Sequence, residues 1–167
     1  LILITPSKAL VYPEHIPDVF FQHKANAHLT SYEKFLKRAD RAGLHYVDGN
    51  AISLQAKQEA PAPVFPRGGT HWNKLTAAQS VAGVIASLEK LSGERLPHIS
   101  PENIQVQHAA EGEDKDLADL LNLIEVPNAY PVPSATYAPQ EQTAPKKSIL
   151  FVGDSFGWAP LDVLHEA

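Results

Sequence analysis

The apolar run Ile149-Leu150-Phe151-Val152, which leads directly into Gly153-Asp154-Ser155-Phe156-Gly157, constrains the fold of this chain most strongly. Four consecutive large apolar residues predict a strand that is buried on both faces, a pattern typical of a parallel sheet. The small residues that follow predict a tight turn with Ser155 at the carboxyl end of the strand. Ligands bind at that edge of open α/β sheets. Ser155 is therefore a candidate functional residue, and the alternative is a plain turn in which Ser155 or Asp154 caps a helix.

The rest of the chain alternates predicted strands with predicted helices. The spacing of apolar residues predicts further strands over residues 1–5, 44–47 and 104–107, and helices over residues 30–42, 50–60, 76–91 and 116–124. Thr30 and Glu33 have the spacing of a capping box, and Gly43 follows as a stop signal. Residues 7–29, 60–70 and 127–146 are rich in proline or glycine and are expected to be loops. This alternation predicts an α/β fold with a mostly parallel sheet.

Composition excludes several classes of protein. The chain has 167 residues, no cysteine and a formal net charge of −5. A thiolate zinc site, a disulfide framework and a cysteine nucleophile are therefore excluded, and a nucleic-acid binder is not expected. No apolar run approaches the length of a membrane-spanning helix. Neither a metal-binding spacing nor a nucleotide-binding glycine motif is present, so no metal and no cofactor are expected.

A second motif could supply the base that a serine nucleophile requires. The chain has eight histidines, and His71 stands out because it lies in the glycine-rich turn Arg67-Gly68-Gly69-Thr70-His71-Trp72-Asn73. A bulky neighbour such as Trp72 could fix the imidazole and exclude water. The alternative is a capping segment in which Asn73 or Thr76 begins the next helix and Trp72 packs in the core. His71 and Ser155 complement each other chemically as base and nucleophile.

These two motifs carry a resemblance to a known family. Thr70-His71-Trp72, upstream of Gly153-Asp154-Ser155-Phe156, resembles the SGNH-hydrolase-like domain of the alginate O-acetylation proteins of the AlgX/AlgJ type. Weaker similarities follow in the same order at 6–17, 46–48 and 116–121. The resemblance implies a three-layer αβα, flavodoxin-like domain that covers residues 1–167 and is expected to be a piece of a longer chain, incomplete at both ends.

The resemblance also implies roles for the site residues. Ser155 would be the nucleophile that carries the acetyl group, and His71 would be the general base and acid. The backbone N–H of Ser155 is the favoured oxyanion donor, and Asp154 would brace the turn. Thr70 and Trp72 would support the histidine. Arg67 could pair with a uronate carboxylate or an acyl oxygen, and the alternative is a solvated loop arginine.

Residue 69 departs from the family pattern. The family usually has Asp-Thr-His-Trp, and its aspartate orients the histidine, whereas this chain has Gly69. Three explanations remain open. Another carboxylate, such as Asp48 or one in a loop, could take the place of the missing acid. A backbone carbonyl could hold the ring and leave a Ser-His dyad. The site could instead be degenerate and only bind sugar.

The resulting functional hypothesis is an O-acetyltransferase or acetylesterase that acts on an exported bacterial polysaccharide through a serine acyl-enzyme. The alternative is a catalytically degenerate carbohydrate-binding or assembly module. The family implies a periplasmic or extracellular location, a polysaccharide substrate and an acetyl donor that a membrane acyltransferase partner could deliver.

Overall fold

The computed structural model describes residues 1–21, 29–125, 127, 129–139 and 148–166. Along the chain the longer elements are β1 (Ile2–Ile4), α1 (Lys8–Val11), α2 (Ser31–Arg41), β2 (Tyr46–Asp48), α3 (Gly49–Glu59), α4 (Lys74–Ser92), β3 (Ile99–Gln107), α5 (Asp116–Leu120), β4 (Val132–Pro139) and α6 (Trp158–Glu166). Short 3-10 turns are η1 (Pro13–His15), η2 (Asp18–Phe21), η3 (Gly112–Lys115) and η4 (Ser155–Gly157).

The strands form two separate pairs among the described residues. β1 and β2 are parallel, with Ile2 opposite Tyr46, whereas β3 and β4 form an antiparallel ribbon. The α/β class is confirmed. The predicted mostly parallel sheet is not found among the described residues, because the antiparallel β3–β4 pair is longer than the parallel β1–β2 pair.

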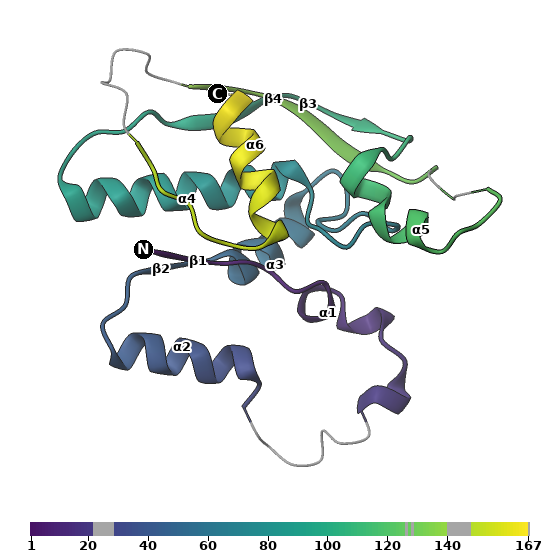
Figure 1. Ribbon diagram of the computed structural model, residues 1–167, viewed down its shortest axis with the longest axis horizontal. Coiled ribbons are helices and arrows are strands. Elements are labelled where there is room, and N and C mark those ends of the chain that lie inside the picture. Colours follow the sequence, from purple (N-terminus) through teal and green to yellow (C-terminus); the bar gives the residue numbers. More distant parts are fainter. Residues whose placement is uncertain (22–28, 126, 128, 140–147, 167) are drawn as a thin grey trace.

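Helix α4 is the central element of the fold. It contacts α3, α6, β2 and both strands of the β3–β4 ribbon. Figure 1 shows α4 between the two strand pairs, with α2 on the far side of β1 and β2. One apolar cluster joins α4 and α6 to the ribbon through Val81, Ile85, Ile99, Tyr137 and Val163. A second cluster lies beneath the predicted site and includes Val11, Val64, Phe65, Trp72 and Ala159.

Local capping signals set the helix boundaries. Thr30 accepts the Glu33 backbone N–H while Glu33 accepts the Thr30 N–H, so the predicted capping box is confirmed. Gly43 follows α2 with a φ of 64°, which glycine adopts without strain. Asn73 caps α4 by accepting the Thr76 N–H, and Gly93 ends this helix with a φ of 72°.

The strand predicted over 149–152 does not form in the described structure. Leu150 is 90% exposed and Val152 is 87% exposed, and no described strand pairs with this segment. The strand predicted over residues 1–5 does form as β1, but Leu1 and Ile2 are exposed rather than buried on both faces. An apolar sequence supplies β propensity, whereas pairing and burial need a neighbour that the sequence pattern does not provide.

The predicted loops and the predicted helix over 116–124 also differ from the structure. The loop over 127–146 contains β4, and the loop over 7–29 contains α1, η1 and η2. The prolines of this segment had favoured a loop over a strand. Both strands of a two-stranded ribbon are edge strands, however, and edge strands tolerate proline. The helix predicted over 116–124 ends at Leu120, and the apolar residues that gave it a helical spacing are exposed, namely Leu117, Leu120, Leu121 and Ile124. Within the described residues no helix has the length and apolarity needed to cross a membrane.

Candidate active site

His71 and Ser155 lie within hydrogen-bond distance of each other. The His71 Nε2 atom is 2.9 Å from the Ser155 Oγ atom, although the two residues are 84 positions apart in the sequence. His71 comes from the turn before α4, and Ser155 begins η4 directly before α6. Contacts between α4 and α6 hold the two turns together. The His71 side chain is 10% exposed, so its environment is set by protein groups rather than by bulk water.

The second imidazole nitrogen contacts a carboxylate that the sequence analysis did not assign to the site. The Asp116 Oδ2 atom lies 2.8 Å from His71 Nδ1. The other oxygen, Oδ1, accepts the backbone N–H groups of Thr70 and Leu117, both at 2.6 Å. Asp48, which had been considered for this position, instead caps α3 and accepts the Tyr32 hydroxyl. Ser155, His71 and Asp116 therefore form one continuous hydrogen-bonded row.

The absence of side chains at Gly68 and Gly69 lets the segment with Asp116 approach His71. A Cβ atom at Gly69 would lie 2.7 Å from the Glu113 carbonyl oxygen, and one at Gly68 would lie 2.3 Å from the Tyr130 hydroxyl oxygen. The Gly68 carbonyl accepts the Ala118 N–H at 2.8 Å, and the Tyr130 hydroxyl donates to the Asp114 carbonyl at 2.7 Å. An aspartate at position 69 would collide with η3. Gly69 is therefore part of the arrangement that brings in Asp116.

Lys8 fixes the turn before His71 through the backbone carbonyls of that turn. Its Nζ atom donates to the carbonyls of Pro66 and Gly69, both at 2.7 Å, and lies 3.4 Å from that of Arg67. Burial lowers the pKa of Lys8, and the negative charge of Asp116 opposes that shift. The Arg67 side chain itself is exposed and takes no part in the Ser155–His71–Asp116 row. Thr70 contributes its backbone N–H to Asp116 rather than its side chain.

The turn around Ser155 is braced by its neighbours. The Asp154 side chain accepts the Phe156 N–H at 3.0 Å, and the Asp154 carbonyl accepts the Gly157 N–H at 3.0 Å. Asp154 thus forms hydrogen bonds within the turn, and its bracing role stays a prediction. The Phe151 ring lies so close to Gly157 that an added Cβ would be 2.3 Å from it. Among the described residues, the Ser155 N–H donates to no acceptor within the chain, so it remains able to bind an oxyanion.

Aromatic groups surround the imidazole. The His71 ring centroid is 4.9 Å from that of Phe156 and 5.9 Å from that of Trp158. Trp72, which was considered as a group that could fix the ring, packs in the core, as the alternative had it. It is buried, and its indole N–H donates to the Phe156 carbonyl at 3.1 Å, which ties the histidine turn to the serine turn.

Carboxyl groups of η3 lie close to the site. Burial raises the pKa of Asp114 to about 6, and the neighbouring charge of Glu113 adds to the shift. Burial also raises the pKa of Glu113. His71 opposes this shift, whereas the charges of Asp162 and Asp116 add to it. Within the described part of the chain no group of three or more histidine and acidic side chains is placed to hold a metal ion.

Sequence reasoning missed Asp116, Lys8 and Trp158 as members of the site. The Gly68-Gly69 pair did carry a signal, because two adjacent glycines mark a close approach of backbone to another segment. The signal at Asp116 was weaker. This residue begins a predicted helix and belongs to the segment 116–121, which has only a weak similarity to the family. Nothing in the sequence links position 116 to position 71, because tertiary packing alone brings them together.

Comparisons with known proteins place this chain in a family. Two curated relatives are both named probable alginate O-acetylase AlgJ. The relative from Pseudomonas syringae pv. tomato is 35% identical over 97 residues, which cover 56% of this chain and 24% of that protein. The relative from Pseudomonas aeruginosa is 38% identical over 82 residues, which cover 49% of this chain and 19% of that protein. The alignments thus span less than a quarter of each curated relative.

A solved structure shares the fold. The O-acetyltransferase domain of Pseudomonas putida AlgJ superposes with a TM-score of 0.52 at 24% sequence identity, and the match covers 84% of this chain and 49% of that domain. The family described as the SGNH hydrolase-like domain of the acetyltransferase AlgX matches residues 1–161, nearly the entire chain. The predicted resemblance is confirmed, and this chain belongs to that family.

Proposed function

We propose that this domain is a serine-dependent O-acetyltransferase or acetylesterase that acts on an exported bacterial polysaccharide, in the periplasm or outside the cell. The observation that carries the proposal is the hydrogen-bonded row from Ser155 Oγ through both nitrogens of His71 to Asp116. A serine hydroxyl becomes a useful nucleophile when an adjacent base removes its proton and a third group orients that base. The names of the AlgJ relatives and of the AlgX family supply the reaction class and the polymer class.

In the first half-reaction Ser155 takes the acetyl group from a donor ester or thioester. His71 Nε2 accepts the hydroxyl proton as Oγ attacks the acetyl carbonyl carbon. Asp116 keeps the Nδ1 proton in place and stabilises the imidazolium that forms. When the tetrahedral intermediate collapses, the bond to the donor's leaving group breaks, and His71 returns its proton to that group. Acetyl-Ser155 and a neutral imidazole remain.

The second half-reaction releases the acetyl group. A sugar hydroxyl enters, His71 removes its proton, and the sugar oxygen attacks the acyl carbon of acetyl-Ser155. Collapse forms the O-acetyl sugar and regenerates the Ser155 hydroxyl with the proton from His71. Water in place of the sugar hydroxyl gives hydrolysis instead. A membrane acyltransferase partner is the proposed source of the acetyl donor.

The Ser155 backbone N–H is the proposed donor to the oxyanion in both steps. Oxyanion stabilisation needs donors that are already oriented and not engaged elsewhere. The N–H groups of Phe156 and Gly157 are occupied by Asp154, whereas that of Ser155 is not engaged within the described residues. Asp154 therefore supports the oxyanion site indirectly, by holding the turn.

The alternative of a degenerate binding module rested mainly on Gly69, and its support is weakened. Asp116 lies against the ring nitrogen that an acid before His71 would have served. An intact row of nucleophile, base and acid is not what a binding module needs. We therefore prefer the catalytic proposal.

The proposal is tested by acetyl-ester turnover and by transfer of labelled acetyl to oligomannuronate. Ser155→Ala is expected to lower both activities by ~10³-fold or more, because the nucleophile is lost. Ser7→Ala, at an exposed serine that makes no side-chain cap, is the matched control and should leave both unchanged. Full activity of Ser155→Ala would contradict the proposal. Hydrolysis without transfer to any glycan would assign the domain as an esterase.

A further inference from the structure

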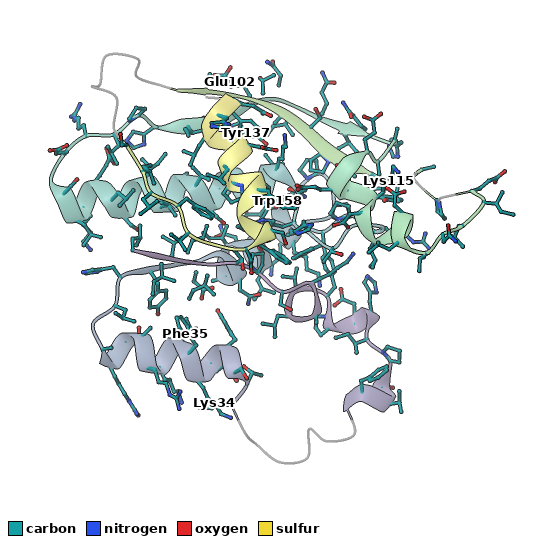
Figure 2. The ribbon with its side chains drawn as sticks, viewed as in Figure 1. Lys34, Phe35, Glu102, Lys115, Tyr137 and Trp158 are labelled. Atoms are coloured by element: carbon teal, nitrogen blue, oxygen red, sulfur yellow. The ribbon has the colours of Figure 1, made fainter. Side chains whose placement is uncertain are left out.

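Trp158 combines solvent exposure with contact to the site. It is 53% exposed, yet its ring centroid lies 5.9 Å from that of His71, and the two planes are tilted by 32°. It is the first residue of α6 and follows η4, the turn that holds Ser155. Figure 2 shows Trp158 beside the start of α6. A large open indole surface thus adjoins the base and the nucleophile.

The fold does not need this indole. The face of α6 that packs against the protein consists of Ala159, Pro160 and Val163, all of which are buried. Trp158 lies on the other face, where Asp162 follows one turn later. Because an exposed indole gains little from burial, its contribution to the stability of the core is expected to be small.

Polar groups accompany the exposed ring. Lys74 Nζ lies 3.2 Å from Asp162 and 2.9 Å from Glu166, so α4 and α6 present a charged row on this side. Glu113 lies beside the histidine turn, since a Cβ at Gly69 would lie 2.7 Å from its carbonyl oxygen, and the charges of His71 and Asp162 act in opposite directions on the pKa of its carboxyl group. An apolar ring flanked by fixed hydrogen-bonding groups suits a ligand with one apolar face and a rim of hydroxyls.

We propose that Trp158 is the stacking surface of an acceptor subsite, on which the C–H face of a pyranose ring lies while its hydroxyls meet Asp162, Glu113 or Lys74. This inference rests on the proposed function and adds to it the residue that positions the acceptor sugar. A sugar stacked on the indole lies next to His71, which places one of its hydroxyls near the base that must deprotonate it.

The chain allows a direct optical test. It contains two tryptophans, Trp72 and Trp158, and Trp72 is only 2% exposed. A change in tryptophan emission on adding a glycan therefore reports mainly on Trp158. The measurement uses Ser155→Ala protein, so that binding is read without turnover and does not depend on whether the acyl-enzyme forms. The probes are a mannuronate hexasaccharide and cellohexaose, which separate uronate from neutral sugars.

Saturable emission changes are expected with at least one probe. Trp158→Ala in the Ser155→Ala background should abolish them and weaken calorimetric binding ~10-fold or more, whereas Trp158→Phe should keep part of the affinity. Phe20→Ala, which removes an aromatic ring that is 73% exposed, is the control and should bind as tightly as the parent. Binding that is unaffected by Trp158→Ala, or no saturable change with either probe, would overturn the proposal. In the active protein Trp158→Ala should raise KM for the acceptor more than it lowers kcat.

Discussion

Asp116 reaches His71 because residue 69 has no side chain. The Cβ of an alanine at this position would lie 2.7 Å from the Glu113 carbonyl, so η3 would have to move. We expect Gly69→Ala to lower acetyl-ester turnover by ~10-fold or more by displacing Asp116 from the ring, and to lower the free energy of unfolding by about 1–3 kcal/mol.

A double-mutant cycle measures whether Gly69→Ala lowers acetyl-ester turnover by displacing Asp116. If it does, adding Gly69→Ala to Asp116→Asn should cause little further loss of kcat. Fully additive losses would show that Gly69 acts on the site by another route.

Asp116 itself gives the sharpest test of the proposed triad. Asp116→Asn keeps the shape of the side chain but removes its charge and lets the imidazole adopt the wrong tautomer. By analogy with the serine-protease triad, kcat should fall by up to ~10⁴-fold while the fold is retained. Asp48→Asn is the matched control, because that carboxylate caps α3 and accepts the Tyr32 hydroxyl. Because Asn caps a helix about as well as Asp, this variant should cost less than about 1 kcal/mol of stability and cause no comparable loss of kcat. Equal effects of the two variants on kcat would refute the assigned role.

At the residue scale the sequence pointed to Ser155 and His71, the proposed nucleophile and base, but not to Asp116, the proposed acid. Ser155 and His71 each stand in a motif whose local order limits what the residue can do. Asp116 stands in an ordinary helix start, and only the packing of η3 against Gly68 and Gly69 gives it a function. Lys8 likewise lacks a local sequence signal, because its three backbone acceptors lie in a turn that is distant in the sequence.

At the scale of elements, α1 holds the turn before His71 through the side chain of Lys8. Lys8→Met would remove the Nζ donor from the Pro66 and Gly69 carbonyls. The Pro66 carbonyl keeps the Gly69 N–H at 3.2 Å, so the loss falls mainly on the Gly69 carbonyl. It should cost about 1–3 kcal/mol and loosen the turn that carries His71. Lys57→Met is the matched control, since Lys57 also donates to a backbone carbonyl, that of Val11 at 2.7 Å. Both variants should lower Tm, but Lys8→Met alone should lower kcat. Equal kcat values in the two variants would argue against a positioning role for Lys8.

The 3-10 turn η3 makes stability depend on pH. Burial and Glu113 raise the pKa of Asp114 to about 6, above its ordinary value of 3.8. Between these two values the folded protein holds the proton more tightly than the unfolded chain, so this group lowers stability as pH rises. Asp114→Asn removes the ionisation and should raise Tm at about pH 7.5 but not at about pH 3.5. Melting curves across this pH range check the prediction, with Asp18→Asn, at an exposed carboxylate, as the control. An equal rise in Tm of Asp114→Asn at both pH values would contradict it.

Elements with local signals were predicted well, and elements that depend on partners were not. The capping box of α2 and the glycine after α4 are encoded within a few residues, so both helices were found. The segment 149–152 has the strongest β propensity but no described neighbour to pair with. The ribbon strand β4 has three flanking or internal prolines, Pro131, Pro133 and Pro139, and forms because β3 supplies a partner.

At the scale of the whole molecule, the site is assembled from parts that are distant in the sequence. α1 supplies Lys8, the turn before α4 supplies His71, α5 supplies Asp116, and η4 supplies Ser155. Figure 1 shows α4 and α6 crossing near the centre of the molecule, where the turns before both helices meet. The buried contacts of Trp72 and Ala159 lie directly beneath. The geometry of the row therefore depends on the packing of this core.

The most direct test of the central claim is to trap the acyl-enzyme. The protein is mixed with an activated acetyl ester, quenched in acid and mapped by peptide mass spectrometry. One acetyl group is expected on Ser155, formed more slowly in Asp116→Asn and absent in His71→Ala. Acetylation that is confined to other residues, or that is as fast without His71, would contradict the central claim.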